Sequence, residues 1–423
     1  MADSTSPLRR ALTMLALVIA GEAVFALPFH VARFFRPTML EVFQLSATQL
    51  GAAQGVYGIF AMLAYFPGGP LADRFPARKL LAVSLWLTAA GGLYLATFPG
   101  YRGAVFIWGF FGVSTILFFW AAMIRACRDW GRADQQGRAF GLLEAGRGAL
   151  AALLATLGVG LFAMTFPDGY AAASFADKRE ALRLIIYGYT VVTATAGVLA
   201  WFAINDGTSE VRREPVRHGI RHVLQMRAVW LQAVIIFCAY VGYKGFDNYT
   251  LFAVQGYGLD EVQAAGIAAI GAWTRPIAAL GAGLLGDRFG NSRTIFLLFA
   301  LLLASYLFFA VTTPVPGAAH VMLGNTLVTC IAMFGFRGLY FALFQESSVP
   351  VAVTGTAAGF VSVVGFTPDI FVTLVAGVLV DASPGLAGHQ HFFYFLSVFA
   401  AVGMLASLLL LRFNATASRQ PLE

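Results

Sequence analysis

The stretch Gly68-Gly69-Pro70-Leu71-Ala72-Asp73-Arg74-Phe75 occurs a second time as Gly283-Leu284-Leu285-Gly286-Asp287-Arg288-Phe289. The two aspartates are 214 residues apart (287 − 73), about half of the 423-residue chain. Each copy closes one long apolar stretch and precedes another. A charged turn that repeats at this distance in an apolar chain predicts two homologous membrane bundles.

Composition sets the broad class of the chain. Hydrophobic residues make up 59% of it, charged residues only 12%, and the mean hydropathy is +0.75. Soluble domains carry about 25% charged residues. Apolar runs of roughly 20 residues recur along the chain, and each is long enough to cross a hydrocarbon core of about 30 Å. Because backbone groups inside lipid must be paired within the segment, these runs are expected to be helices, which makes the chain a polytopic membrane protein.

About twelve spans are expected, and they divide the chain into two halves. The longest polar stretch, 205–225, separates the sixth span from the seventh and contains a cluster of arginines and histidines. We therefore expect an N-terminal six-helix bundle over 1–204, a cytoplasmic linker over 205–225 and a C-terminal six-helix bundle over 226–423. The spans lie near 11–34, 48–72, 78–97, 103–127, 136–164, 183–204, 226–254, 262–285, 293–313, 318–346, 353–380 and 391–412.

Lysine and arginine between the spans indicate the orientation. If the N-terminus is cytoplasmic, 18 basic residues fall on the cytoplasmic side and 6 on the other, with four more inside spans. This asymmetry predicts that both termini are cytoplasmic. The net charge of +7 is therefore interpreted as a topology signal, and no nucleic-acid partner is expected.

The repeated turn also carries a family resemblance. The stretches from Gly69 to Lys79 and from Gly283 to Arg293 resemble the loop motif G-x-L-a-D-R-x-G-R-[RK] of the major facilitator superfamily, although Pro76 replaces the usual glycine. The residues from Arg337 to Asp369 look like a poorly characterised bacterial subgroup of that family. The resemblance covers essentially the whole chain. It implies an all-α membrane fold of about twelve transmembrane helices in two pseudo-symmetric six-helix bundles, a substrate site between them near the bilayer midplane, a monomer and a bacterial inner membrane.

The motif also suggests a gate. Asp73 and Asp287 end helices where they can accept hydrogen bonds from neighbouring arginines and face the positive end of an adjacent helix. Such contacts would lock the cytoplasmic side in the outward-facing state and break when the halves rock; alternatively, the basic residues only set orientation. The residues expected to act in conformational gating are Gly69, Asp73, Arg74, Arg78, Gly283, Asp287 and Arg288.

Ionisable residues inside spans are the candidates for solute binding or coupling, because a buried charge is costly unless it is paired or hydrated. Four acids and four bases sum to zero, so internal pairing is possible for all of them. They are Glu22, Glu144, Arg147, Lys244, Asp247, Arg275, Arg337 and Asp369, with His30 and Arg33 near the outer end of the first span.

Arg275 is the leading candidate for a solute contact. It lies 12 residues before Asp287, hence about 18 Å from the cytoplasmic end of its helix, close to the midplane. A guanidinium group there can bind a carboxylate or a similar anion through two parallel hydrogen bonds. The alternative is a structural pair with Asp369 or Asp247.

Arg147 and Glu144 are three residues apart and share a helical face, so a structural pair is favoured over solute contact. Arg337, with Tyr340 near it, either holds an anion or pairs with Glu144 or Asp369. Aromatic residues that could line a cavity are Tyr57, Tyr65, Trp120 and Tyr340, with Tyr240 and Tyr243.

The first and seventh spans suggest an outer gate and a coupling site. An Arg33–Asp247 bridge would close the outer side; alternatively, each side chain reaches to the headgroups. Glu22, in the middle of a span, is a candidate coupling group, with a carboxylate bonded to hydroxyls of a neighbouring helix as the alternative. Asp369 is the second coupling candidate.

The favoured function is a secondary active transporter that moves a small polar, anionic organic solute by alternating access, with proton coupling left open. The alternatives are a carrier of lipids or amphipathic compounds and a membrane sensor that binds solute without moving it. No helix with metal-ligand spacing, G-x-S-x-G elbow or phosphate-binding loop occurs in the sequence, so no enzyme, cofactor or bound metal is expected. The expected partners are a small-molecule solute and the lipid bilayer.

Overall fold

The computed structural model describes residues 7–131, 136–204, 223–340, 343, 346 and 351–417. These residues are mostly helical, and no strand occurs among them. The helices are α1 (Pro7–Phe25), η1 (Ala26–His30), α2 (Val31–Phe34), α3 (Arg36–Phe43), α4 (Ala47–Arg74), α5 (Ala77–Leu95), α6 (Tyr101–Thr115), η2 (Ile116–Trp120), α7 (Ala121–Trp130), α8 (Gln136–Met164), η3 (Tyr170–Ala172), α9 (Phe175–Ala203), α11 (Arg227–Gly245), η4 (Phe246–Asn248), α12 (Tyr249–Tyr257), α13 (Glu261–Ala272), α14 (Thr274–Phe289), α15 (Asn291–Val311), α16 (Ala319–Leu339), α18 (Val351–Gly365), α19 (Pro368–Ala382) and α20 (Leu386–Ala417).

The helices follow the spans expected from the sequence. Within the described residues, eleven helical segments are long and apolar enough to cross a membrane. The third expected span is α5, whose first turn holds Arg78 and Lys79 and which is not among the eleven. The predicted linker 205–225 lies outside the described residues except for its last three positions, so the domain boundaries remain a prediction.

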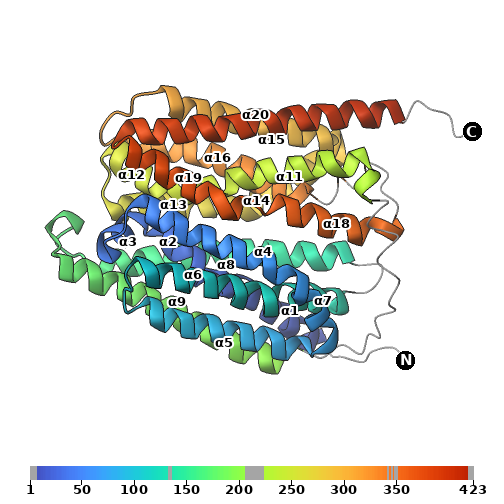
Figure 1. The fold of residues 1–423 in the computed structure, drawn as a ribbon, viewed down its shortest axis with the longest axis horizontal. Helices are drawn as coiled ribbons and strands as arrows, with labels where there is room; N and C mark the ends of the chain where they lie inside the picture. Colours follow the sequence, from blue (N-terminus) through green and yellow to red (C-terminus); the bar gives the residue numbers. More distant parts are fainter. Residues whose placement is uncertain are drawn as a thin grey trace, which may run out of the picture.

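The repeat is visible in the helix boundaries. Shifted by 214 residues, the bounds of α4 become 261–288, the stretch that α13 and α14 occupy together. The start of α1 and the end of α20 lie at one end of the elongated molecule, which we call the termini end (Figure 1). The α4–α5 turn after Asp73 and the α14–α15 turn after Asp287 both lie at this end, as a parallel duplication requires.

Two bundles lie side by side in Figure 1, the first half in blue to green and the second in yellow to red. Inside the first bundle α4 packs on α6, α5 on α9, and α1 on α8 and α9. Inside the second, α15 and α11 pack on α20, and α14 packs on α16. The main contacts between the bundles are those of α4 with α19 and of α8 with α13 and α14.

Glycines let α4 and α19 pack backbone against backbone. A Cβ added at Gly51 would overlap the carbonyl oxygen of Thr373, and one at Gly58 would overlap the backbone of Asp369. Small residues at such positions allow the close approach that drives helix association in lipid. The seam starts beside Asp369 and continues to Gly377, which lies against Ala47 near the end opposite the termini, called here the far end.

Polar contacts also join the halves toward the far end. Asp381 on α19 accepts hydrogen bonds from the backbone amides of Ala47 (3.2 Å) and Thr48 (2.7 Å) at the start of α4. These amides have no partner within their own helix, so the carboxylate completes its N-terminus. On the other seam the Trp273 indole donates to Thr156 Oγ1 at 2.9 Å. The two halves are therefore held together on the far-end side.

Candidate functional site: a charged cavity between the two halves

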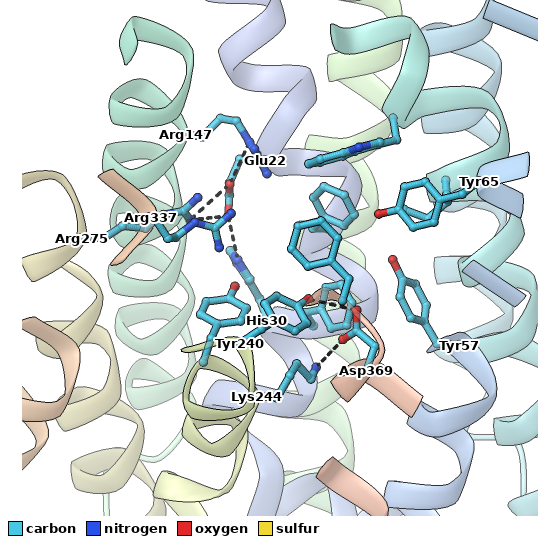
Figure 2. Close-up of a pocket in the computed structure, with 16 residues that line it drawn as sticks. Glu22, His30, Tyr57, Tyr65, Arg147, Tyr240, Lys244, Arg275, Arg337 and Asp369 are labelled. Atoms are coloured by element: carbon cyan, nitrogen blue, oxygen red, sulfur yellow. Dashed lines mark hydrogen bonds and ion pairs between the residues drawn. The ribbon is translucent and has the colours of Figure 1, made fainter. Parts of the chain in front are cut away.

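A cavity of about 70 Å³ lies where the two halves meet. It takes side chains from both bundles, as a site shared by two repeats requires. Figure 2 shows an arginine-rich side and, across a group of aromatic rings, a side with Tyr57, Tyr65 and Asp369. The lining residues are Glu22, Phe25, Phe29, His30, Tyr57, Tyr65, Ile116, Trp120, Arg147, Tyr240, Tyr243, Lys244, Arg275, Arg337, Phe366 and Asp369.

Irregular helix turns supply several of these residues. The first span changes from α-helix to a π turn over Ala26–His30, which contains Pro28. Proline has no amide hydrogen to donate to the preceding turn, and π turns are found often at functional sites. The Trp108 indole donates to the carbonyl oxygen of Pro28 at 3.3 Å and so supports the turn. A second π turn, Ile116–Trp120 in the fourth span, brings Trp120 to the cavity.

Glu22 is the buried acid on the arginine-rich side. Its side chain is 5% exposed, and three cationic or titratable groups surround it. His30 Nε2 lies 3.3 Å from one carboxylate oxygen, Arg275 Nη1 lies 3.4 Å from the same oxygen, and Arg147 Nε lies 3.5 Å from the other oxygen. The sequence left hydroxyl partners open for this carboxylate, but the structure gives it arginines and a histidine. His30 Nδ1 is also buried and has no hydrogen-bond partner among the described residues.

Glu144 is the second acid on this side, and it reaches across the boundary between the halves. Oε1 contacts Arg147 on the same helix, and Oε2 lies 3.7 Å from Arg275 and 3.7 Å from Arg337. Its side chain is 41% exposed, in contrast to that of Glu22. The predicted Glu144–Arg147 pair is therefore present, but it belongs to a larger group.

We call Arg147, Arg275, Arg337, Glu22 and Glu144 the arginine cluster. Three guanidinium groups against two carboxylates leave this cluster with a net charge of +1 when His30 is neutral. The arginines come from α8, α14 and α16, hence from both halves. A net positive charge in a largely enclosed group is costly in isolation, so the cluster is chemically suited to contact an anion.

Arg275 has partners other than those the sequence suggested. The expected alternatives to a solute contact were Asp369 and Asp247, whereas its ion pairs in the structure are with Glu22 and Glu144. The reason is the packing of α14 on α8, where the Arg275 side chain lies against Gly148. That contact directs the guanidinium group toward the acids of the first half.

A second group, the lysine cluster, consists of Arg33, Lys244, Asp247 and Asp369 and is neutral in sum. Lys244 Nζ lies 2.7 Å from Asp247 and 3.4 Å from Asp369. Arg33 Nε lies 2.6 Å from Asp247 Oδ1, so the bridge expected from the sequence is present. Its role as an outer gate remains a prediction. The Tyr240 hydroxyl donates to Asp369 at 2.9 Å and extends the cluster into the cavity.

Aromatic side chains separate the two charged groups. Phe29 packs edge-on against Tyr57, with ring centroids 4.8 Å apart, and the Lys244 ammonium lies 4.5 Å from the centroid of Phe29. The guanidinium groups of Arg33 and Arg337 lie over the ring of Tyr243 at 4.7 and 5.2 Å. Ring faces of this kind attract cations and offer flat contact to an apolar part of a solute.

Most of the candidate site residues meet at this cavity. Ten of them line it, namely Glu22, His30, Tyr57, Tyr65, Trp120, Arg147, Lys244, Arg275, Arg337 and Asp369. Glu144, Arg33 and Asp247 contact lining residues without lining the cavity themselves. Tyr340 is buried and does not line it. The lining residues that the sequence analysis missed are Phe25, Phe29, Ile116 and Phe366, although the first two follow Glu22 at helical spacing.

The two motif turns lie away from the cavity. Asp73 and Asp287 are exposed, and no ion pair of either is seen in the part of the chain that the structure describes. Gly69 and Gly283 have open space where a Cβ would lie. The nearby Arg125 instead donates to the carbonyl oxygen of Ala72 at the end of α4. The gating role of the motif thus stays a prediction about another conformation.

Two pseudo-symmetric six-helix bundles around a shared polar cavity define a polytopic membrane transporter. The family model for the Major Facilitator Superfamily matches residues 18–371, and the chain belongs to this family. Its fold and family are those of transporters rather than of enzymes.

Known relatives agree with this assignment. The chain is 26% identical to "Inner membrane protein YihN" of Escherichia coli strain K12 over 412 residues, which cover 94% of each chain. It is 25% identical to "Probable nitrate/nitrite transporter NarK2" of Mycobacterium tuberculosis H37Rv over 327 residues, covering 74% and 75%. Among solved structures, a bacterial homologue of the human lysosomal transporter Spinster, in an inward-facing unoccupied conformation, matches with a TM-score of 0.78 at 14% identity, covering 99% of this chain and 100% of that one.

Proposed function

We propose that this transporter carries a small organic anion across the membrane by alternating access, with the anionic group of the solute bound by Arg147, Arg275 and Arg337. The observation that carries this proposal is the net charge of +1 of the arginine cluster inside a cavity shared by both halves. An arginine fork binds carboxylate or phosphate through two parallel hydrogen bonds. A solute held by Arg147 on one half and by Arg275 and Arg337 on the other would join the two bundles.

The rest of the cavity suits the remainder of such a solute. Opposite the arginines are the phenol groups of Tyr57 and Tyr65 and the carboxylate of Asp369, to which the Tyr240 hydroxyl donates. Hydroxyl or amine groups of a solute could hydrogen-bond there, while the ring faces of Phe29 and the other aromatic residues would contact its apolar faces. The relative NarK2 bears a name that refers to small anions, nitrate and nitrite, which agrees with the charge of the cluster.

The place of the chain in the cell follows from the same reasoning. We propose that the chain lies in a bacterial inner membrane, since its relative is named "Inner membrane protein YihN". We also propose that both termini are in the cytoplasm and that the transporting unit is a monomer. Among the described basic residues that set this orientation by the positive-inside rule, Arg9, Arg78 and Arg293 lie at the starts of α1, α5 and α15, at the termini end. The far-end contacts then close the outer side, and a solute would reach the arginine cluster from the cytoplasm.

A thermal-shift screen of the purified protein tests the anion proposal. Nitrate, phosphate, gluconate and benzoate form the anionic set, and xylose and uridine the neutral one. A solute present at about 100 times its Kd adds roughly 2.7 kcal/mol to the stability of the folded state. We expect at least one anion to raise the melting temperature and both neutral solutes to leave it unchanged.

Variants locate the binding and separate the alternatives. Arg275→Ala should remove the anion-induced shift, whereas Arg102→Ala, which alters an exposed arginine at the start of α6, should keep it. Stabilisation by phospholipid or detergent-like amphiphiles alone would favour a lipid carrier. An anion that binds but never crosses in proteoliposomes would favour a sensor, and no binding by any anion would overturn the proposal.

A further inference from the structure

Glu144 differs from the other acids near the cavity in how it is held. Its side chain is 41% exposed, whereas those of Glu22, Asp247 and Asp369 are 5%, 1% and 12% exposed. A carboxylate that only neutralises neighbouring arginines would be expected to be enclosed with them. The exposure of Glu144 leaves it free to move without unpacking a helix.

The contacts of Glu144 are spread over all three guanidinium groups. It contacts Arg147, three residues later on α8, and lies 3.7 Å from both Arg275 and Arg337 of the other half. These two separations exceed hydrogen-bond length, so the interactions across the boundary are weak ion pairs. No other acid of the described residues has ion pairs with all three arginines.

Glu22 approaches the same cluster differently. It is enclosed by His30, Arg147 and Arg275 and makes no ion pair with Arg337. Along α8, Glu144 is one helical turn nearer the termini end than Arg147. Glu22 therefore positions the guanidinium groups from within, and Glu144 covers them on the side from which we expect the solute.

We propose that Glu144 is an internal surrogate for the solute: its carboxylate, which lies beside the cavity and not in its lining, occupies the three guanidinium groups while no solute is bound and is displaced when the solute's anionic group binds them. This inference rests on the proposed anion transport. In this role Glu144 sets the affinity for the solute and permits the return of the carrier without solute. A free carboxylate or phosphate would take over its contacts with the three arginines.

The net charge of the arginine cluster determines what happens when the Glu144 carboxylate is removed. With Glu144 in place, the empty arginine cluster carries +1; without this carboxylate it would carry +2, and a bound monoanion would restore +1. Uncompensated charge opposes closure of a cavity that excludes water. A carrier that lacks the Glu144 carboxylate should therefore reorient when loaded but not when empty. It should exchange solute for solute and lose net uptake.

The experiment uses the full chain in detergent and in proteoliposomes, with nitrate, phosphate and gluconate as probes. The variants are Glu144→Gln, Glu144→Asp and Glu22→Gln. The matched control is Glu180→Gln, which removes the acid of another i, i+3 pair, that with Arg183, at an exposed site on α9. For each we measure the melting temperature without probe, the probe-induced shift, the Kd, net uptake and counterflow exchange.

Glu144→Gln should bind the probe at least about tenfold more tightly, which corresponds to the loss of a competitor worth roughly 1.4 kcal/mol. Its melting temperature without probe should fall while the probe-induced shift grows, and counterflow should persist without net uptake. Glu144→Asp, with a shorter reach, should lie between wild type and Glu144→Gln. Glu180→Gln should match wild type.

Three results would overturn the inference, and they separate it from the proposed function. If wild type binds a probe and Glu144→Gln binds it no better, Glu144 is a structural partner and anion transport stands. If Glu22→Gln tightens binding as much as Glu144→Gln, total charge and not the position of Glu144 sets affinity. If neither wild type nor Glu144→Gln binds any probe, the anion site itself is wrong.

Discussion

Arg33 and Asp247 form a 2.6 Å ion pair although they are 214 residues apart, the same distance that separates the two aspartates of the repeated turn. The two side chains therefore occupy equivalent positions in the two halves. Equivalent positions can touch only beside the pseudo-two-fold axis that relates the halves. The duplication has placed opposite charges at one symmetric point, between the cavity and the far end.

Replacing Asp247 alone should destabilise the protein more than replacing both residues of the pair, because the lysine cluster is neutral as a whole. Asp247→Asn leaves Arg33 and Lys244 against Asp369 alone, and breaking a buried pair in this way costs about 3–5 kcal/mol. The double variant Arg33→Gln/Asp247→Asn restores neutrality and keeps the Lys244–Asp369 pair. We expect it to melt at a higher temperature than Asp247→Asn, as measured by thermal unfolding in detergent.

Transport by the same variants tests the gate. Arg33→Gln, Asp247→Asn and the double variant all lack the bridge, so all three should transport more slowly than wild type even where stability is recovered. If the stability losses of Arg33→Gln and Asp247→Asn add up to the loss of the double variant, the two residues do not interact. Wild-type uptake by the double variant would show that the bridge is not needed for outer closure.

The close seam between α4 and α19 gives a prediction about packing. A methyl group at position 51 would overlap the Thr373 carbonyl, so Gly51→Ala should force the two helices apart. Overpacking of this kind costs about 1–3 kcal/mol. Gly160→Ala is the matched control, because a Cβ there meets no neighbouring atom, and removal of glycine from a helix interior should stabilise it by up to about 1 kcal/mol.

Thermal unfolding of both variants decides this point. Gly51→Ala should melt below wild type and Gly160→Ala at or above it. Equal melting temperatures would mean that the seam adapts to a methyl group without loss, and that its glycines do not determine the distance between the halves.

The large-scale organisation could be predicted from the sequence because it depends on features that repeat along the chain. Apolar length alone gives the spans, and the duplicated turn at Asp73 and Asp287 gives the two halves. The Arg33–Asp247 pair was also predictable, since the repeat offset relates the two positions. Glu144 and Arg147 pair because helical spacing fixes their common face.

The partners inside the cavity were harder to predict because they depend on helix rotation and on contacts between halves. The π turn at Pro28 adds a residue to one turn of the first span and changes the face that Phe29 and His30 present. The acids that meet Arg275 are set by the packing of α14 on α8 beside Gly148. Neither effect is visible in the composition or periodicity of a single span.

Two acids remain candidates for proton coupling, and their surroundings differ. Glu22 has two arginines and His30 around it, whereas Asp369 has, among the described residues, one cation, Lys244, at 3.4 Å and shares it with Asp247. Asp369 is thus the less compensated acid and the better site for a proton that is taken up and released. If transport is proton-coupled, Asp369→Asn should lose accumulation driven by an imposed pH gradient and keep counterflow.

The contrast with Glu22→Gln makes that experiment decisive. Glu22→Gln should lower the melting temperature more than Asp369→Asn, because it leaves two arginines without their enclosed counter-charge. Loss of gradient-driven accumulation in Glu22→Gln, with Asp369→Asn unaffected, would identify Glu22 as the coupling acid. Accumulation that ignores the gradient in wild type would show that the carrier is uncoupled.

The repeated turn should matter for movement but not for the stability of the present conformation. Asp73 and Asp287 are exposed and lack ion pairs among the residues described, so Asp73→Asn and Asp287→Asn should leave the melting temperature within about 1 °C, as surface substitutions do. If these aspartates bind arginines when the cytoplasmic side closes, both variants should slow uptake severalfold.

Asp168→Asn, at an exposed far-end loop, is the control and should transport like wild type. Uptake at the wild-type rate by both motif variants would show that the arginines of the turn only set the orientation of the protein in the membrane. A large loss of stability in either would mean that the aspartate already supports the present conformation.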